Sequence, residues 1–319
     1  MDERKLIRLG NSSFAISLPI DWVKKAGLNK GDEIALVENS NGELVVSPEF
    51  NAGEEKETEI DLNKSDEYTL EKEIKSAYVK GYDKLNLKGK NDYELKKKTK
   101  DIGSKLLSFE LVKETKDSLV FKDFFKSEEV EIRGFIKRID NNIREAFEIL
   151  LKGFGSEGIT GKDLENIEEI EEDINRLYML ISRIMFKSFD NPSILKKLNM
   201  KNIDLFTNWW FSFNLEHIGD GVKKTARHLG KKPLNKGKKE LESYFKEIKS
   251  IYMNKIKSFY KRDKEMALKA MKKSKKIFRK YIEKGNKSKD PSFSIVKENL
   301  ENLQDACYQN LKMLLYNEL

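Results

Sequence analysis

The sequence has very few of the residues that hold soft metal ions or act as nucleophiles. Its 319 residues include a single cysteine, Cys307, and two histidines, His217 and His228. One cysteine excludes an internal disulfide framework and a cysteine-rich zinc site, and two histidines are too few for a histidine-based metal centre. Any metal ion would therefore be held mainly by carboxylates.

Long apolar runs are also missing. No stretch approaches the ~20 apolar residues of a membrane-spanning helix, and the N-terminal MDERKLIRLG lacks the apolar core of a signal peptide. We therefore expect a cytoplasmic protein with no membrane insertion. A chain of this length is long for one hydrophobic core, so two or three domains are expected.

Positive charge is concentrated in one block of the chain. Residues 223–290 contain 25 Lys and Arg against 7 Asp and Glu, a balance of +18, whereas the whole chain carries +8. Such a block is usually a solvated helix face, but it could also attract nucleic acid, an anionic membrane surface or an acidic partner. The sequence leaves these alternatives open.

Residues 1–48 predict a small β-rich domain. The segments RKLIRLG and FAISLP indicate strands, DWVKKAG a short helix, and EIALVENSNGELVVSP a hairpin that turns at Asn41-Gly42. So few residues bury little core alone, which favours pairing with a second copy of the chain. Residues 1–50 hold six Lys and Arg against eight Asp and Glu, so a DNA-binding surface would have to be a local patch.

The motifs GNSSFAISLP, DWVKKAGL and KGDEIALV follow a basic first strand and resemble the SpoVT/AbrB family of swapped-hairpin DNA-binding domains. In that family two chains interleave their hairpins into one dimer, and basic residues of the first strand and the next loop approach the phosphate backbone. The resemblance implies a homodimer that binds DNA. The implied DNA-facing residues are Arg4, Lys5, Arg8, Asn11, Ser12 and Ser13, with Lys24 and Lys25 as secondary contacts. The alternative is a dimerisation or antitoxin-like module that has no DNA partner.

Residues 58–125 predict a small α+β module. Helical signals in TLEKEIKSAYVKGY and DYELKKKTKDIGSKL alternate with strand signals in KLNLK and FELVKETKDSLVFKDF. The module holds no nucleophile with a base, no glycine-rich phosphate loop and no histidine cluster. A connector or effector-sensing role is therefore more plausible than catalysis.

From residue 127 to 319 the apolar residues recur with the 3.6-residue period of helices. Breakers such as GFGSEG, Asn191-Pro192 and Pro291 divide this region into six helical stretches. We expect helices at 130–153, 162–189, 203–230, 238–260, 265–284 and 292–316. They predict an all-α region of two three-helix bundles in tandem, 127–230 and 236–319.

The third and sixth of these helices share a motif. NLEHIGDGVKKTARHL aligns with NLENLQDACYQNLKML, so that Glu216 matches Glu301 and Asp220 matches Asp305. Packing requires the apolar positions to match, but it does not require carboxylates at equivalent positions beside the apolar stripe. A second similarity, between INRLY at 174–178 and IFRKY at 277–281, supports an internal duplication of a three-helix unit.

The repeated N-L-E-x-[IL]-x-D motif resembles that of PhoU, the phosphate-signalling regulator. YVKGYDKLNL and DIGSKLLSFELVKETKDSLVFKDF further resemble the middle part of archaeal proteins that join an AbrB-type domain to a PhoU-type domain. In the PhoU family, carboxylates of adjacent helices hold a multinuclear cluster, generally of iron or zinc. The resemblance implies Glu216 and Asp220 as first-choice ligands, with Glu301 and Asp305 at the equivalent second site. Hard oxygen ligands suit such cations, which would also offset the repulsion of like charges four residues apart.

The sequence departs from the PhoU pattern on the neighbouring helix. Where the family often has E-V-D-R-L-Y, this chain has DINRLY, with Asn175 in place of the aspartate. Asp173, Glu169 and Glu172 are the nearest acids, and Asp173 and Glu169 share a helix face, so they predict a displaced ligand set. In the second bundle the equivalent helix is dense in lysine, so we expect its site to be weak or vacant, with Glu301 and Asp305 paired to lysines. The ordinary alternative for Asp220 is an ion pair with Lys223 or Lys224.

Together these features predict a DNA-binding regulator of phosphate uptake that is not an enzyme. The alternative is a DNA-independent adaptor that docks on a phosphate transporter or a sensor kinase, while its N-terminal domain only dimerises. We expect no catalytic role because no positioned nucleophile or base accompanies the carboxylates.

Overall fold

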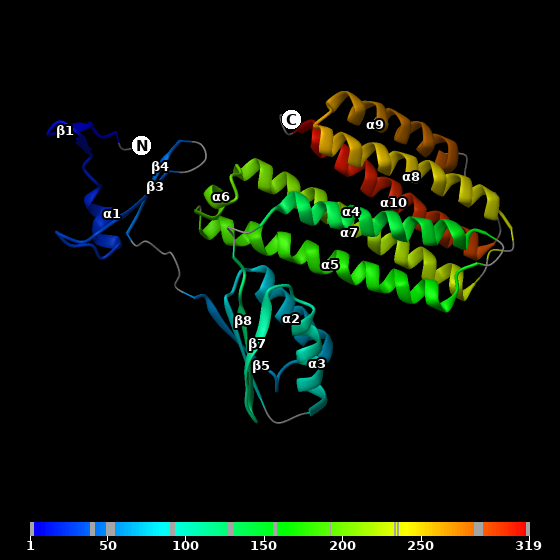
Figure 1. The fold of residues 1–319 in the computed structure, drawn as a ribbon, viewed down its shortest axis with the longest axis horizontal. Coiled ribbons are helices and arrows are strands. Elements are labelled where there is room, and N and C mark those ends of the chain that lie inside the picture. Colours follow the sequence, from blue (N-terminus) through cyan, green and yellow to red (C-terminus); the bar gives the residue numbers. More distant parts are fainter. Residues whose placement is uncertain are drawn as a thin grey trace.

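The computed structural model describes residues 3–38, 42–48, 55–89, 93–126, 130–155, 158–191, 193–232, 234, 236–283 and 290–316. Figure 1 shows a small β-rich N-terminal unit, an α+β module and a region of long helices, in that order along the chain. The multi-domain layout expected from the sequence is thus confirmed. Within the described ranges, no helix is both long and apolar enough to cross a membrane.

The N-terminal unit consists of two separate hairpins and a short helix. Strands β1 (Ile7–Leu9) and β2 (Ser13–Ala15) pair antiparallel, as do β3 (Ala35–Glu38) and β4 (Leu44–Ser47). Helix α1 (Ile20–Lys25) lies between them in sequence. Each hairpin forms a two-stranded sheet of its own in the described part of the chain. The predicted hairpins are present, with Asn41 of the second turn lying outside the described residues.

The α+β module is built on one four-stranded sheet of order β5-β6-β8-β7. Its elements are β5 (Glu57–Asp61), α2 (Glu67–Val79), β6 (Lys84–Lys88), α3 (Tyr93–Ser104), β7 (Phe109–Glu114) and β8 (Ser118–Asp123). Strand β5 pairs parallel to β6, and the other two pairs are antiparallel. Leucine and phenylalanine side chains of the sheet form a core with buried residues of α2 and α3, such as Leu70, Ile74 and Ile102.

Strand β5 is an element that the sequence analysis did not predict. Its residues ETEID are mostly acidic, and acidic residues are depleted in strands. The strand is supported instead by cross-strand ion pairs on the solvent side of the sheet. Lys84 lies 2.7 Å from Glu57, and Lys88 lies 2.6 Å from Glu59.

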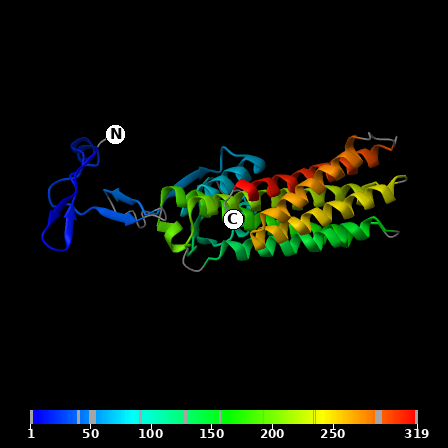
Figure 2. The ribbon, with the colours of Figure 1, turned by 90° about the horizontal axis from the view of Figure 1, so that it is seen from above.

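The helical region contains the six long helices that the sequence predicted. They are α4 (Ile132–Gly153), α5 (Gly161–Asp190), α7 (Asn202–Lys231), α8 (Lys238–Lys261), α9 (Lys264–Phe278) and α10 (Pro291–Tyr316). A short helix, α6 (Ser193–Lys197), and a π-helical turn, Arg279–Glu283, were not predicted. Helices α4, α5 and α7 pack together, as do α8, α9 and α10, and α7 packs along α10 to join the two sets. Figure 2 shows the long helices side by side along one direction.

Two glycines allow α7 to pack closely on both sides. A Cβ atom at Gly219 would lie 2.9 Å from Ile174 Cδ1 of α5, and one at Gly221 would lie 2.8 Å from Leu303 Cδ2 of α10. Real Cβ atoms essentially never approach other atoms so closely. The Gly-Asp-Gly sequence therefore lets one helix contact both sets of helices, with Asp220 between the two glycines.

The α+β module is tied to α5 by a buried arginine. The side chain of Arg183 is fully buried, and its guanidinium donates to the backbone oxygens of Tyr78 and Tyr82 and to the carboxylate of Asp123 at the end of β8. Lys187, one turn further along α5, lies 3.1 Å from the same Asp123 carboxylate. These contacts hold the module against the long helices.

Candidate functional site

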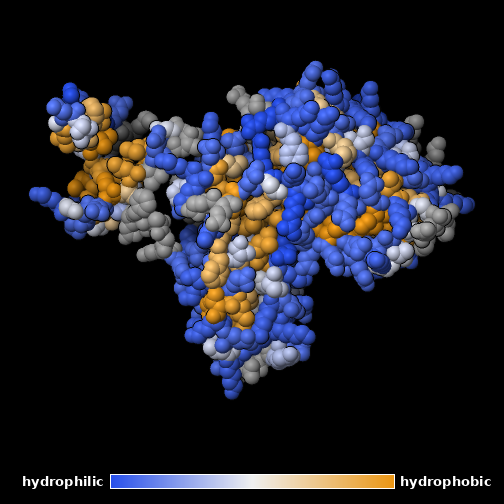
Figure 3. Space-filling view, viewed as in Figure 1, coloured by the Kyte–Doolittle hydropathy of each residue, from blue (hydrophilic) through white to orange (hydrophobic). Residues whose placement is uncertain are grey.

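The N-terminal unit exposes almost all of its apolar side chains. Ala35 is the one buried residue among the described side chains of residues 3–48. Ten large apolar side chains are exposed to solvent in the isolated chain: Leu6, Ile7, Leu9, Phe14, Ile16, Ile20, Ile34, Leu36, Leu44 and Val45. Figure 3 shows hydrophobic surface on this unit, at the left of the view. Monomeric proteins rarely expose contiguous apolar patches of this kind.

All of the residues predicted to face DNA are exposed, and most lie on or beside the first hairpin. Arg8 is on β1 opposite Phe14, and its Nε donates to the Gly10 backbone oxygen over 3.2 Å. The turn of this hairpin carries Asn11 and Ser12, and Ser13 opens β2. Arg4 and Lys5 precede β1, whereas Lys24 and Lys25 end the separate helix α1. One hairpin therefore presents Arg8 together with the polar loop.

In the helical region, a lysine occupies the space between the carboxylates of α5 and α7. Lys223 Nζ lies 2.6 Å from Glu171 Oε1 of α5 and 3.5 Å from Asp220 Oδ1, one turn earlier on α7. Lys224 Nζ lies 2.6 Å from the other oxygen of Asp220. The ion pairs that were the ordinary alternative for Asp220 are thus present.

The two acids of the α7 motif have different electrostatic surroundings. Burial raises the pKa of Glu216, and the negative charge of Asp220 raises it further. The charge of His217, whose Nδ1 lies 2.8 Å away, acts to lower this pKa but does not outweigh burial. Burial also acts to raise the pKa of Asp220. The hydrogen bond from Lys224 and the charges of Lys224 and Lys223 outweigh it and hold that pKa below its usual value.

The α5 acids that the sequence pointed to are engaged elsewhere or exposed. Asp173 accepts two hydrogen bonds from Arg138 and one from Asn142, both on α4. Glu172 lies 2.8 Å from Lys105 at the end of α3, and Glu169 is exposed. None of the three is brought to Glu216 and Asp220 by an ion pair or hydrogen bond recorded for the described residues.

The acid of α5 that does reach this place is Glu171, which sequence reasoning missed. It also accepts a 2.7 Å hydrogen bond from Asn175, which stands where the PhoU pattern has an aspartate. The sequence held a signal for this placement. Glu171 lies four residues after Ile167 and three before Ile174, both buried, so it flanks the apolar stripe that faces the other helices.

The equivalent acids of the second set of helices are also paired on their own helix. Glu301 lies 3.7 Å from Lys297, and Asp305 accepts a hydrogen bond from Gln309 over 3.4 Å. The lysine partner expected for Glu301 is therefore found, although it comes from α10 and not from the lysine-rich α9.

These residues, as arranged here, do not fit a multinuclear metal cluster. In the ranges that the structure describes, no three His, Cys, Asp or Glu side chains are placed to hold a metal ion together. Glu171, Glu172 and Lys223 line a groove of about 460 Å³ against α3, where the carboxylates are matched by lysines and arginines. The iron or zinc site at Glu216, Asp220, Asp173, Glu169, Glu172, Glu301 and Asp305 stays a prediction.

Comparison with known protein families supports the interpretation of the N-terminal unit. Residues 7–49, which run from β1 to beyond β4, match the family described as antidote-toxin recognition MazE, bacterial antitoxin. The chain therefore carries a MazE/AbrB-like domain, a type compatible with DNA binding and regulation. Searches of curated proteins and of solved structures return no match.

Proposed function

We propose that this chain is a cytoplasmic DNA-binding regulator whose N-terminal unit is completed by a second copy of the chain. The observation that carries the proposal is the set of ten exposed apolar side chains on a MazE/AbrB-like segment whose two hairpins share no sheet. Pairing with a second copy would bury these side chains, at about 25 cal/mol per Å² of apolar surface. A two-fold dimer follows, because the same surface would then meet itself.

The same pairing would give a local basic patch despite the acidic balance of the domain. Each copy contributes Arg4, Lys5 and Arg8, and a two-fold axis doubles them. Phosphate contacts from such residues supply most of the sequence-independent affinity for DNA, while the polar loop Asn11–Ser13 sits beside Arg8 on the same hairpin.

The regulated process that we propose is phosphate uptake, by analogy with PhoU. Two features support this finer proposal: the two sets of three long helices, and the Glu-x-x-x-Asp pairs in register on α7 and α10. The helical region would respond to a partner such as a phosphate transporter or sensor protein. We propose a regulatory and not a catalytic role for it.

A mobility-shift experiment at near-physiological salt tests DNA binding. The full chain should shift operator-length duplex DNA, and the Arg4→Ala/Lys5→Ala/Arg8→Ala variant should lose most of that affinity. The matched control removes the same charge from α9, as Lys269→Ala/Lys272→Ala/Lys276→Ala, where all three side chains are exposed. Equal binding by the wild type and the N-terminal variant would reject the assigned surface.

A DNA-independent adaptor is the second candidate, favoured by the excess of acidic over basic residues in residues 1–50. An adaptor would pair through its N-terminal units but show only weak, salt-sensitive DNA binding. In that case both triple variants would behave alike. Light scattering should find a two-chain mass under either proposal, and a concentration-independent monomer would exclude both.

A further inference from the structure

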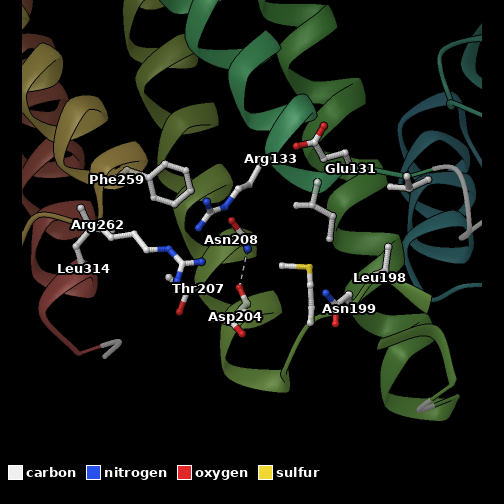
Figure 4. A pocket seen from close by; sticks show the side chains of 13 residues that line it. Glu131, Arg133, Leu198, Asn199, Asp204, Thr207, Asn208, Phe259, Arg262 and Leu314 are labelled. Carbon is white, nitrogen blue, oxygen red and sulfur yellow. Dashed lines mark hydrogen bonds between the residues drawn. The ribbon is translucent and has the colours of Figure 1, made fainter. Parts of the chain in front are cut away.

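A pocket of about 300 Å³ opens at one end of the helical region, where the two sets of helices meet. Its walls come from the start of α4, the segment between α6 and α7, the first turns of α7, and the ends of α8 and α10. Figure 4 shows this pocket with its side chains. It shares no lining residue with the carboxylates of the α7 motif, and Asn199, Met200 and Asp204 of its wall also line a second recess beside Glu38 of β3.

Two arginines from different helices extend into the pocket. Arg133 belongs to the first turn of α4, and Arg262 follows the end of α8. Figure 4 shows both guanidinium groups reaching toward the same part of the pocket, beside Thr207 and Asn208. Among the described residues, neither guanidinium has an ion pair or hydrogen bond. Arg133 instead lies 5.9 Å from the centre of the Phe259 ring.

Neither acid that lines the pocket forms an ion pair with these arginines in the described part of the chain. Asp204 accepts a hydrogen bond from the Lys201 backbone N–H at the start of α7, over 3.3 Å. The Glu131 carboxylate lies above both guanidinium groups in the view of Figure 4. Two like charges from separate helices therefore face one space, an arrangement that an anion would stabilise.

The rest of the lining is suited to the body of a small organic molecule. Leu198, Met200 and Leu314 supply apolar surface next to the arginines. A volume near 300 Å³ is at the small end of known ligand sites. The planar guanidinium fork matches the oxygens of a phosphate or carboxylate and can bind them bidentately.

We propose that this pocket binds a small organic anion. Its phosphate or carboxylate group is held by Arg133 and Arg262, and its apolar part lies against Leu198 and Met200. Because Arg133 comes from one set of helices and Arg262 from the other, the bound anion links the two sets. The proposal does not depend on DNA binding or on a role in phosphate uptake.

Isothermal titration calorimetry of the full chain with three probes tests the proposal. Phenyl phosphate and benzoate carry the two head groups on an apolar body, and inorganic phosphate carries the head group alone. We expect saturable binding of phenyl phosphate or benzoate in the millimolar range or tighter, and weaker binding of inorganic phosphate. Tighter binding of inorganic phosphate than of both organic probes would overturn the organic ligand class.

Variants then locate the binding. Each of Arg133→Gln and Arg262→Gln should weaken it on the order of tenfold, because a hydrogen bond to a charged group is lost. Arg138→Gln is the matched control, since Arg138 is also on α4 but already pairs with Asp173. Both pocket arginines are at least partly exposed, so the variants should fold, which circular dichroism checks. Unchanged binding in the Arg133→Gln/Arg262→Gln double variant, or no saturable binding of any probe, would overturn the proposal.

Discussion

The ammonium group of Lys223 lies 2.6 Å from the carboxylate of Glu171, and this pair joins α7 to α5. Both side chains are largely buried, with exposed fractions of 15% and 12%. The same ammonium is 3.5 Å from Asp220. A fixed protein cation thus offsets the repulsion among the acids of the repeated motif, at the place where the PhoU resemblance implies a metal ion.

The two acids of the α7 motif should respond oppositely to neutralisation. Because burial raises the pKa of Glu216, its charged form destabilises the fold at neutral pH, and Glu216→Gln should stabilise the protein by roughly 0.5–1 kcal/mol. Because the lysines hold the pKa of Asp220 low, Asp220→Asn should destabilise it by a similar amount.

The pH dependence of thermal unfolding tests whether the two substitutions change the stability in opposite directions. The gain from Glu216→Gln should vanish as the pH falls below the ordinary carboxyl pKa, where Glu216 is protonated in both the folded and unfolded states. The loss from Asp220→Asn should persist to lower pH and vanish only below the depressed folded pKa. Changes of the same sign at pH 7 would contradict this assignment.

Lys223 should compete with any metal ion at the motif. Lys223→Gln removes the cation that lies between Glu171 and Asp220, and the carboxylate oxygens that it exposes suit hard or borderline cations. Titration with zinc should therefore show tighter binding by this variant than by the wild type. Lys224→Gln is the control, because Lys224 is more exposed and contacts only Asp220 among these acids. Equal zinc affinity in wild type and Lys223→Gln would show that the lysine does not occupy a cation site.

Replacing Arg183 should weaken the attachment of the α+β module. Arg183→Met leaves the buried Asp123 carboxylate with Lys187 as its remaining ion-pair partner, and loss of one member of a buried pair typically costs about 3–5 kcal/mol. Urea unfolding measures the loss. Arg176→Met on the same helix breaks only an exposed hydrogen bond to the Lys105 backbone and should cost less than about 1 kcal/mol. Similar losses for both variants would argue against a special role for Arg183.

A methyl group at Gly221 should disturb the contact between α7 and α10. Its Cβ would lie 2.8 Å from Leu303 Cδ2 and 3.0 Å from Cγ. Overpacking should cost about 1–3 kcal/mol of stability. This cost should exceed the gain of up to about 1 kcal/mol from replacing a helical glycine by alanine. Gly161→Ala at the start of α5 meets no atom within 4 Å and should be neutral or stabilising in denaturant unfolding. A stabilised Gly221→Ala would mean that the two sets of helices are not closely packed there.

The long helices could be predicted because their buried residues recur with the helical period. Leu215, Ile218 and Val222 are buried as the apolar stripe of α7 requires. Strand β5 could not be predicted, because cross-strand lysines stabilise it and the sequence of the strand itself does not reveal them. The placement of Glu171 beside the α7 motif could not be predicted for a similar reason. The helix face on which an acid lies does not determine which basic side chain it pairs with. Asp173 accepts a hydrogen bond from Arg138 of α4.

The salt dependence of DNA affinity tests the central claim most directly. Each neutralised phosphate contributes about −0.9 to the slope of log K against log salt, and a paired unit presents Arg4, Lys5 and Arg8 twice. The slope of the Arg4→Ala/Lys5→Ala/Arg8→Ala variant should therefore be shallower than that of the wild type by about five. Identical slopes for the two proteins would contradict a DNA-binding surface on the paired N-terminal units.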